Sequence, residues 1–193
     1  MGEGWLEQVR ARLARPRPAS SPPVEWPGEK PPRPASVLVP LYVRERALHV
    51  LLTRRTETVE HHKGQVSFPG GVAEEGDADP WATALRETEE EIGVPAAAVR
   101  RLGELPRVLT VTGFEISPFV GAIPWPVELD LEEREVAEVL EVPLAWLLDP
   151  ASSSERTLTW NGREVRTPVY AWRGHVIWGA TARIVSELAR ALG

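Results

Sequence analysis

Residues 70–94 read GGVAEEGDADPWATALRETEEEIGV, and eight of these 25 residues are acidic. After two glycines and an acidic loop, apolar residues recur at spacings of three and four from Pro80 to Ile92. That spacing predicts a helix with one buried face. Asp79 can cap the first turn, Pro80 suits that turn, and Gly93 can end the helix.

The acidic residues of this helix are concentrated on one face. Glu87, Glu90 and Glu91 stand at positions i, i+3 and i+4, so their carboxylates are neighbours. Like charges at this spacing repel, and a bound cation reverses that cost. Carboxylates without histidine or thiolate suit a hard ion, so Mg²⁺ or Mn²⁺ is the expected cofactor. Arg86, four residues before Glu90, can orient that carboxylate. The alternative is a solvated acidic face that binds nothing.

Two glycines precede the acidic loop. Gly70 and Gly71 follow the short segment Val66–Phe68, which predicts a strand. Glycine lets the backbone turn sharply and approach a ligand closely. A strand, a glycine loop and a carboxylate helix in this order predict a cradle for a diphosphate and its metal ion.

The composition limits the classes of function. A chain of 193 residues that is 42% hydrophobic is long enough for one domain with an attached arm. There is no cysteine, which excludes disulfides, thiolate metal sites and cysteine nucleophiles. The net charge of −6 argues against a nucleic-acid or membrane partner. Because no apolar run is long enough to span a membrane and no signal peptide begins the chain, a cytoplasmic location is expected.

The chain is expected to have two parts. Residues 1–35 predict a short amphipathic helix and a proline-rich arm, and residues 36–193 form the main domain. The fold class is α/β (α+β), with a mixed β-sheet sandwiched between helices. Its strands are expected at 36–43, 48–56 and 66–68, within 107–123, and in a hairpin over 156–173 that turns at Asn161-Gly162, with a last helix over 180–192.

The sequence RETEEEIGV, which begins at Arg86, resembles the core of the Nudix box, R-E-U-x-E-E-x-G-U, where U is apolar. Upstream, the usual glycine and glutamate positions hold Val72 and Ala78. One extra residue in the loop restores the match, with Gly71 and Asp77 in those roles. The resemblance to the Nudix hydrolase superfamily implies the Nudix fold.

A second segment resembles one branch of that superfamily. Residues 51–71, LLTRRTETVEHHKGQVSFPGG, are similar to the signature that precedes the box in coenzyme A pyrophosphatases. The loop GD…TALRE and the segments EVAEVLEVPLAWLL and GHVIWGATARIV also resemble that branch. The resemblance implies hydrolysis of the pyrophosphate bond of coenzyme A to 4′-phosphopantetheine and adenosine 3′,5′-bisphosphate. Coenzyme A is then the expected partner, and a homodimer is a candidate assembly.

The resemblance also assigns roles to the acidic residues. Glu87 and Glu91 are implied as metal ligands, and Glu90 as a third ligand or the general base. Outside the box, Glu115 and Glu135 are candidates for an additional ligand or base, and each can equally be a surface acid.

The substrate-binding residues are expected in the segment 51–71. Arg54 and Arg55 can bind a substrate phosphate or lie on the surface. Lys63 is a candidate contact for the pantetheine or the diphosphate. The neighbouring histidines, His61 and His62, are interpreted as structural or solvated, and the alternative for His62 is the same contact as that of Lys63.

Two other functions remain open. A Nudix pyrophosphatase could act on ADP-ribose, NADH or a dinucleoside polyphosphate, and the box alone does not discriminate among these substrates. The other is a non-catalytic Nudix-like binding module, which typically lacks box carboxylates that this chain retains.

Overall fold

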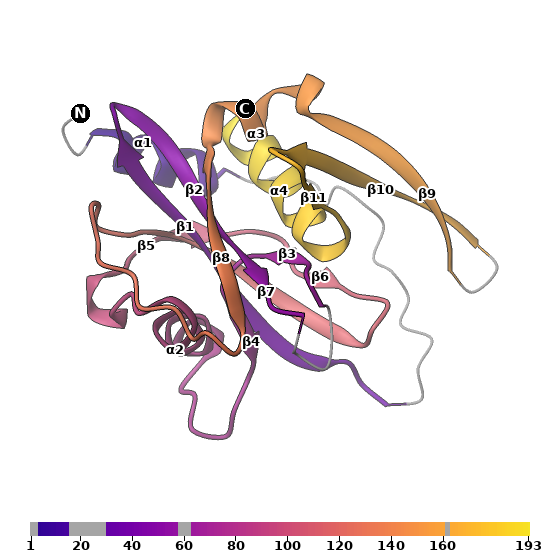
Figure 1. The fold of residues 1–193 in the computed structure, drawn as a ribbon, viewed down its shortest axis with the longest axis horizontal. Helices are drawn as coiled ribbons and strands as arrows, with labels where there is room; N and C mark the ends of the chain where they lie inside the picture. The colour runs from indigo at the N-terminus through magenta and orange to yellow at the C-terminus, as the bar shows by residue number, and fades with distance from the viewer. Residues whose placement is uncertain (1–3, 16–29, 58–62, 161–162) are drawn as a thin grey trace.

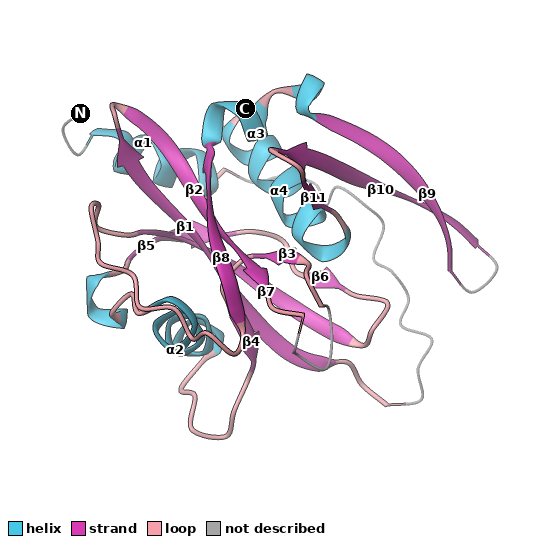
Figure 2. Ribbon diagram, viewed as in Figure 1, coloured by secondary structure: helices cyan, strands magenta, loops and turns pink. Residues whose placement is uncertain are grey.

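A computed structural model of the chain describes residues 4–15, 30–57, 63–160 and 163–193. Figure 2 shows its helices and strands. The strands are β1 (Arg33–Arg44), β2 (Ala47–Arg55), β3 (Val66–Ser67), β4 (Gly70–Val72), β5 (Arg100–Glu104), β6 (Val108–Leu109), β7 (Phe114–Ala122), β8 (Val136–Pro143), β9 (Ser153–Trp160), β10 (Arg163–Trp172) and β11 (His175–Ile177). The α-helices are α1 (Gly4–Leu13), α2 (Pro80–Ile92), α3 (Leu144–Leu148) and α4 (Gly179–Leu192), with short 3-10 helices η1 (Ala96–Ala98) and η2 (Pro150–Ser152).

The main sheet is mixed and is built around β1. Its path is β3-β2-β1-β7-β5, with β4 added to β1, β6 to β7 and β8 to β2. β1 is antiparallel to β2 and β4 but parallel to β7, with Ser36 beside Ser117. The long β1 strand is thus shared: its first residues hold β4, which carries the glycine pair, and its last residues hold β2.

Helices cover both faces of this sheet (Figure 1). On one face, α2 buries Ala84 and Ile92 against Leu38 and Leu51 of β1 and β2. On the other face, a larger apolar cluster includes residues of α1, α3 and α4. The expected mixed sheet between helices is confirmed. None of the described helices has the length and apolarity that crossing a bilayer requires.

A second, three-stranded sheet in the order β11-β10-β9 packs against α4. The antiparallel pairing of β9 with β10 agrees with the predicted hairpin. The turn predicted at Asn161-Gly162 lies outside the described residues.

The N-terminal helix packs on the main body. Leu6, Val9 and Leu13 of α1 are buried in the larger apolar cluster. The Arg10 guanidinium donates to the carbonyl oxygen of Arg101 in β5 at 2.9 Å. β1 begins at Arg33, and the division of the chain at residues 35 and 36 stays a prediction.

Candidate active site

The helix α2 forms where the sequence predicts it. The Asp79 carboxylate accepts a hydrogen bond from the backbone N–H of Ala82 at 2.8 Å, and Pro80 follows as the first helical residue. Gly93 ends the helix with a φ of 72°, in the left-handed region that favours glycine. Because its apolar stripe is fixed against the sheet, α2 carries its acidic residues along the edge of β4.

The two glycines let β4 lie directly against the glutamates. A Cβ on Gly71 would stand 2.4 Å from Oε2 of Glu87, so that carboxylate occupies the space a side chain would fill. Gly70 has a φ of 149°, and its backbone N–H donates to Oε2 of Glu91 at 3.3 Å. The predicted closeness of the glycine loop to the carboxylate helix is therefore present in the structure.

Glu91 is a buried acid, because its side chain is only 5% exposed. Arg55, at the end of β2, approaches Oε1 of Glu91 at 3.4 Å and Oε2 of Glu135 at 3.0 Å. The pKa of Glu91 is raised to about 8, chiefly by burial and also by the nearby Glu87 and Glu135 carboxylates. Arg55 and the Gly70 N–H act in the opposite direction.

Arg86 ties the acidic loop to the helix. Its guanidinium donates to both carboxylate oxygens of Asp77, at 3.0 and 3.1 Å, and to the carbonyl oxygen of Val72 at 3.0 Å. Its Nη1 also donates to Glu87 and to Glu90, at 3.0 Å each. These hydrogen bonds hold the pKa of Asp77 well below its usual range. The predicted contact between Arg86 and Glu90 is thus seen.

Glu87 and Glu90 differ in environment. Burial raises the pKa of Glu87, and the charge of Arg86 lowers it in part. The Glu90 side chain is 60% exposed, against 17% for Glu87. Glu87 and Glu91 therefore form the buried part of the cluster, and Glu90 lies at its open edge.

These acids fit a hard divalent cation by the type of their donor atoms, which are all carboxylate oxygens. Within the described part of the chain, no three acidic or histidine side chains are already grouped as metal ligands. Glu87 and Glu90 face Arg86, and Glu91 faces Arg55. Holding a cation would require these carboxylates to turn away from the guanidinium groups that now balance their charge.

The structure separates the other candidate residues. Arg54 is adjacent to Arg55 but contacts Glu138, not Glu91. Lys63 is exposed, and His61 and His62 lie outside the described residues. Of the two acids proposed from outside the box, Glu135 reaches the cluster through Arg55, whereas Glu115 forms an ion pair with Arg107 at 2.9 Å. The sequence named both acids as candidates and favoured Glu115.

Comparison with known proteins decides the family. The NUDIX domain model matches residues 32–160, which include the whole cluster. The chain belongs to the Nudix hydrolase family. That family acts on nucleoside diphosphate derivatives, so the helix α2 is called the Nudix helix below.

Similar proteins match the Nudix domain and much of the remaining chain. The uncharacterized Nudix hydrolase NudL of Photorhabdus laumondii is 40% identical over 158 residues, which cover 82% of this chain and 84% of the relative. The protein of the same name from Cronobacter sakazakii is 42% identical over 161 residues, which cover 83% of each. Among solved structures, a NUDIX hydrolase from Alicyclobacillus acidocaldarius is 25% identical, with a TM-score of 0.53 over 63% of this chain and 83% of that one.

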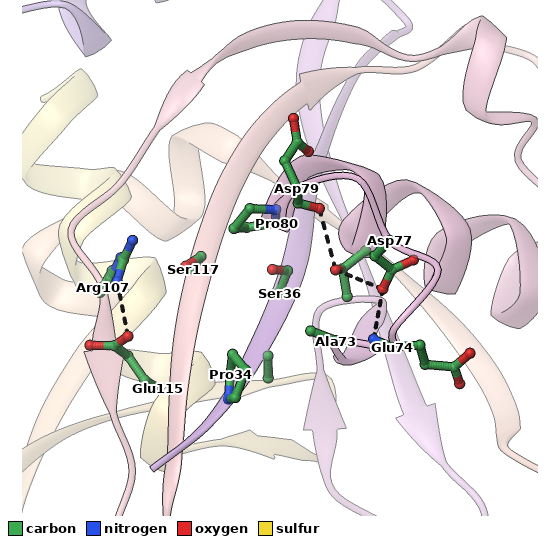
Figure 3. Close-up of a pocket in the computed structure, with 12 residues that line it drawn as sticks. Pro34, Ser36, Ala73, Glu74, Asp77, Asp79, Pro80, Arg107, Glu115 and Ser117 are labelled. Atoms are coloured by element: carbon green, nitrogen blue, oxygen red, sulfur yellow. Dashed lines mark hydrogen bonds and ion pairs between the residues drawn. The ribbon is translucent and has the colours of Figure 1, made fainter. Parts of the chain in front are cut away.

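A small open pocket lies beside the first turn of the Nudix helix (Figure 3). Its volume is about 190 Å³, and its walls come from β1, β7, the loop after β4 and the start of α2. Sequence reasoning identified Glu115 in this region but missed Ser36, Ser117 and Thr83. Ser36 had a weak signal: it is a polar residue at the start of the apolar run SVLVPLYV.

Proposed function

We propose that this Nudix protein hydrolyses the pyrophosphate bond of coenzyme A or its derivatives in a reaction that depends on Mg²⁺ or Mn²⁺. The products would be 4′-phosphopantetheine and adenosine 3′,5′-bisphosphate. Family membership supports the reaction class, and the resemblance of residues 51–71 to the coenzyme A branch supports the substrate.

One observation carries the proposal. The segment that resembles the coenzyme A branch also supplies two groups around the buried acids, the Arg55 guanidinium and the Gly70 N–H. Its Gly71 leaves the space that the Glu87 carboxylate fills. The segment and the Nudix helix therefore make one site. A diphosphate placed there would meet a guanidinium, a backbone donor and carboxylates that can hold a cation.

The cation would be held by Glu87, Glu90 and Glu91, and it would neutralise phosphate oxygens and acidify the attacking water. On binding the cation, Glu87 and Glu90 would give up their hydrogen bonds to Arg86, which would stay paired with Asp77.

The structure favours one assignment outside the box. We assign the additional acid to Glu135 in place of Glu115, because Glu135 shares Arg55 with Glu91. With a pKa raised to about 8, Glu91 of the metal-free protein is mostly protonated at physiological pH. Glu90 therefore stays the candidate base, and Glu91 would become a ligand as the cation displaces its proton. Arg55 can bind a substrate phosphate, whereas Arg54 is paired with Glu138 on the neighbouring strand β8.

Product analysis tests the proposal. The protein is incubated with coenzyme A, ADP-ribose or NADH, each with Mg²⁺ and with Mn²⁺, and the nucleotide products are separated. Fastest formation of adenosine 3′,5′-bisphosphate from coenzyme A is the expected result. Faster release of AMP from ADP-ribose or NADH would keep the Nudix chemistry and reject the substrate. No hydrolysis of any of the three would reject the enzymatic proposal and return attention to a binding module.

A homodimer stays a prediction. Light scattering coupled to size-exclusion chromatography tests it directly, since the monomer has a mass of 21.4 kDa.

A further inference from the structure

The small open pocket beside the Nudix helix, called the cavity below, has polar groups of its own. At about 190 Å³ it is smaller than the roughly 300–1,000 Å³ typical of sites for drug-sized ligands, so it has room for one fragment of a larger molecule. Ser36 and Ser117 are neighbours across the parallel strands β1 and β7, and both line the cavity. Figure 3 shows the two serines on neighbouring strands, with Arg107 and Glu115 on one side of them and Asp77 on the other.

Ser36 is the residue that points to a ligand. It is only 1% exposed, and its hydroxyl makes no hydrogen bond with any side chain or backbone group among the described residues. Buried hydroxyls are normally hydrogen-bonded, because an unmade bond leaves a desolvated polar group. In Figure 3 its oxygen points across the cavity toward Ser117, so a group bound there would complete its hydrogen bonding.

The lining of the cavity is mostly acidic, so it would repel a phosphate group. Among the described residues of the lining, four are acids, Glu74, Asp77, Asp79 and Glu115, and one, Arg107, is a cation. That cation, Arg107, is already paired with Glu115. The cavity therefore favours a group that donates hydrogen bonds and carries no negative charge.

The cavity also lies within reach of the glutamate cluster. Thr83 on its wall and Glu87 are four residues apart on α2, so they share one stripe of the helix. At 1.5 Å of rise per residue, Glu87 stands roughly 6 Å and Glu91 roughly 12 Å further along the axis. A molecule whose diphosphate lies at Glu87 and Glu91 can therefore extend an uncharged end into the cavity.

We propose that this cavity binds an uncharged, N–H-bearing end of the substrate, held by the hydroxyls of Ser36 and Ser117. The identity of the substrate rests on the proposed function. In coenzyme A this chemistry has two sources, the amino group of adenine and the amide N–H groups of pantetheine. The cavity adds a specificity site to the cluster that performs the hydrolysis.

Titration of the isotope-labelled full chain tests this inference. Adenosine, pantetheine and inorganic phosphate are added separately in the presence of Mg²⁺, and the backbone amide shifts of Ser36, Thr83 and Ser117 are followed. Saturable shifts with adenosine place the base in the cavity, and shifts with pantetheine place the amide chain there. No shift with either, or shifts of these amides with phosphate, overturns the inference.

Three variants sharpen the result. Ser36→Ala should weaken binding of the fragment roughly three- to tenfold, the usual effect of one hydrogen bond. It should raise KM for coenzyme A while kcat stays within about twofold. Ser117→Ala repeats the test where Ser36→Ala fails to fold, and Ser153→Ala, an exposed serine in the three-stranded sheet, is the matched control. Unchanged binding in both pocket variants also overturns the inference.

The same preparations are assayed for turnover of coenzyme A. Turnover of coenzyme A without binding of either fragment in the cavity would reject the cavity as a binding site and leave the proposed function intact. Fragment binding without turnover of coenzyme A rejects the substrate and keeps the cavity as a site for another nucleotide derivative.

Discussion

At the scale of single residues, the protonation of Glu91 depends on opposing neighbours. Burial and the carboxylates of Glu87 and Glu135 favour the protonated acid. Arg55 and the N–H of Gly70 favour the charged carboxylate. A cation at this position would also favour the charged carboxylate and would displace the proton, because metal ligands must be deprotonated.

Glutamine at either buried position tests the role of the carboxylates. Glu87→Gln and Glu91→Gln should each lower kcat by at least roughly 100-fold, since a metal ligand is lost while the side chain keeps its shape. The unfolding free energy of neither variant should fall, because no cavity opens and repulsion is relieved. Steady-state kinetics at saturating Mg²⁺ and denaturant unfolding measure the two effects. Glu89→Gln, on the same helix but outside the cluster, is the control, and wild-type turnover in either cluster variant would refute the metal assignment.

The raised pKa of Glu91 predicts a pH dependence of stability. At pH values between the ordinary pKa of 4.5 and the raised pKa of about 8, Glu91 is protonated in the native protein and ionised in the unfolded chain. The unfolding free energy of the metal-free protein should therefore fall as the pH rises through this window, by an amount on the order of a few kcal/mol.

The Glu91→Gln variant lacks this titrating carboxyl, so its unfolding free energy should depend less on pH over the same range. Denaturant unfolding of both proteins at several pH values, without divalent ions, measures the difference. Mg²⁺ should stabilise the wild type more at pH 8 than at pH 6, because at pH 8 a larger fraction of Glu91 has already lost the proton that the cation must displace. Equal pH slopes in the two proteins would show that Glu91 does not titrate with a raised pKa.

At the scale of elements, two adjacent glycines of β4 serve different purposes. A Cβ on Gly70 would stand 2.3 Å from the carbonyl oxygen of Ser36 and 2.6 Å from Cα of Val37, which are backbone atoms of β1. A Cβ on Gly71 would meet only the carboxylate of Glu87, the free end of a flexible side chain. One glycine allows the strand to pair, and the other leaves room for the glutamate.

The two alanine variants should therefore fail differently. Gly70→Ala should lower the unfolding free energy by about 1–3 kcal/mol, since φ is 149° and backbone must move. Gly71→Ala should unfold nearly as the wild type does but lose roughly 10- to 100-fold in kcat, because Glu87 is displaced. Thermal unfolding and kinetics on both variants form one experiment. A Gly71→Ala enzyme with full activity would mean that the observed position of Glu87 is not the working one.

The same scale explains what the sequence could predict. The Nudix helix was predicted with its cap and end because Asp79, Pro80 and Gly93 act through local geometry. β5 and β8 were not predicted, because β5 is defined by its pairing with β7 and β8 by its pairing with β2. Such pairings join distant parts of the chain, and short strands carry little local signal.

The same limit applied to the candidate site. The spacing of Glu87, Glu90 and Glu91 on one helix could be read directly. The choice between Glu115 and Glu135 could not be made from the sequence, because it depends on where β7 and β8 lie relative to Arg55. The hydroxyl of Ser36 became informative only once its burial and its lack of a partner among the described residues were visible.

At the scale of the whole molecule, the sheet needs cover on both faces, and α1 provides part of it. Leu6, Val9 and Leu13 are buried against the cluster that includes β5 and α4. Leu13 lies close to Gly103, where an added Cβ would come within 2.9 Å of it. The helix α1 is therefore packed on the fold, on the face opposite the Nudix helix.

Because α1 lies on the face opposite the glutamates, a substitution in α1 should change the stability of the protein without changing its catalytic activity. Leu13→Ala should lower the unfolding free energy by roughly 2–4 kcal/mol, the usual cost of removing a buried leucine. Its kcat and KM at 25 °C should stay within about twofold of wild type, since α1 covers the face of the sheet that does not carry the glutamates. Gln8→Ala, at an exposed position of the same helix, controls for the loss of any side chain. Equal stability of the two variants would mean that α1 does not cover the sheet in solution. A loss of activity in Leu13→Ala at full folding would mean that packing behind the sheet sets the position of β1, and with it the glycine pair and the cavity at Ser36.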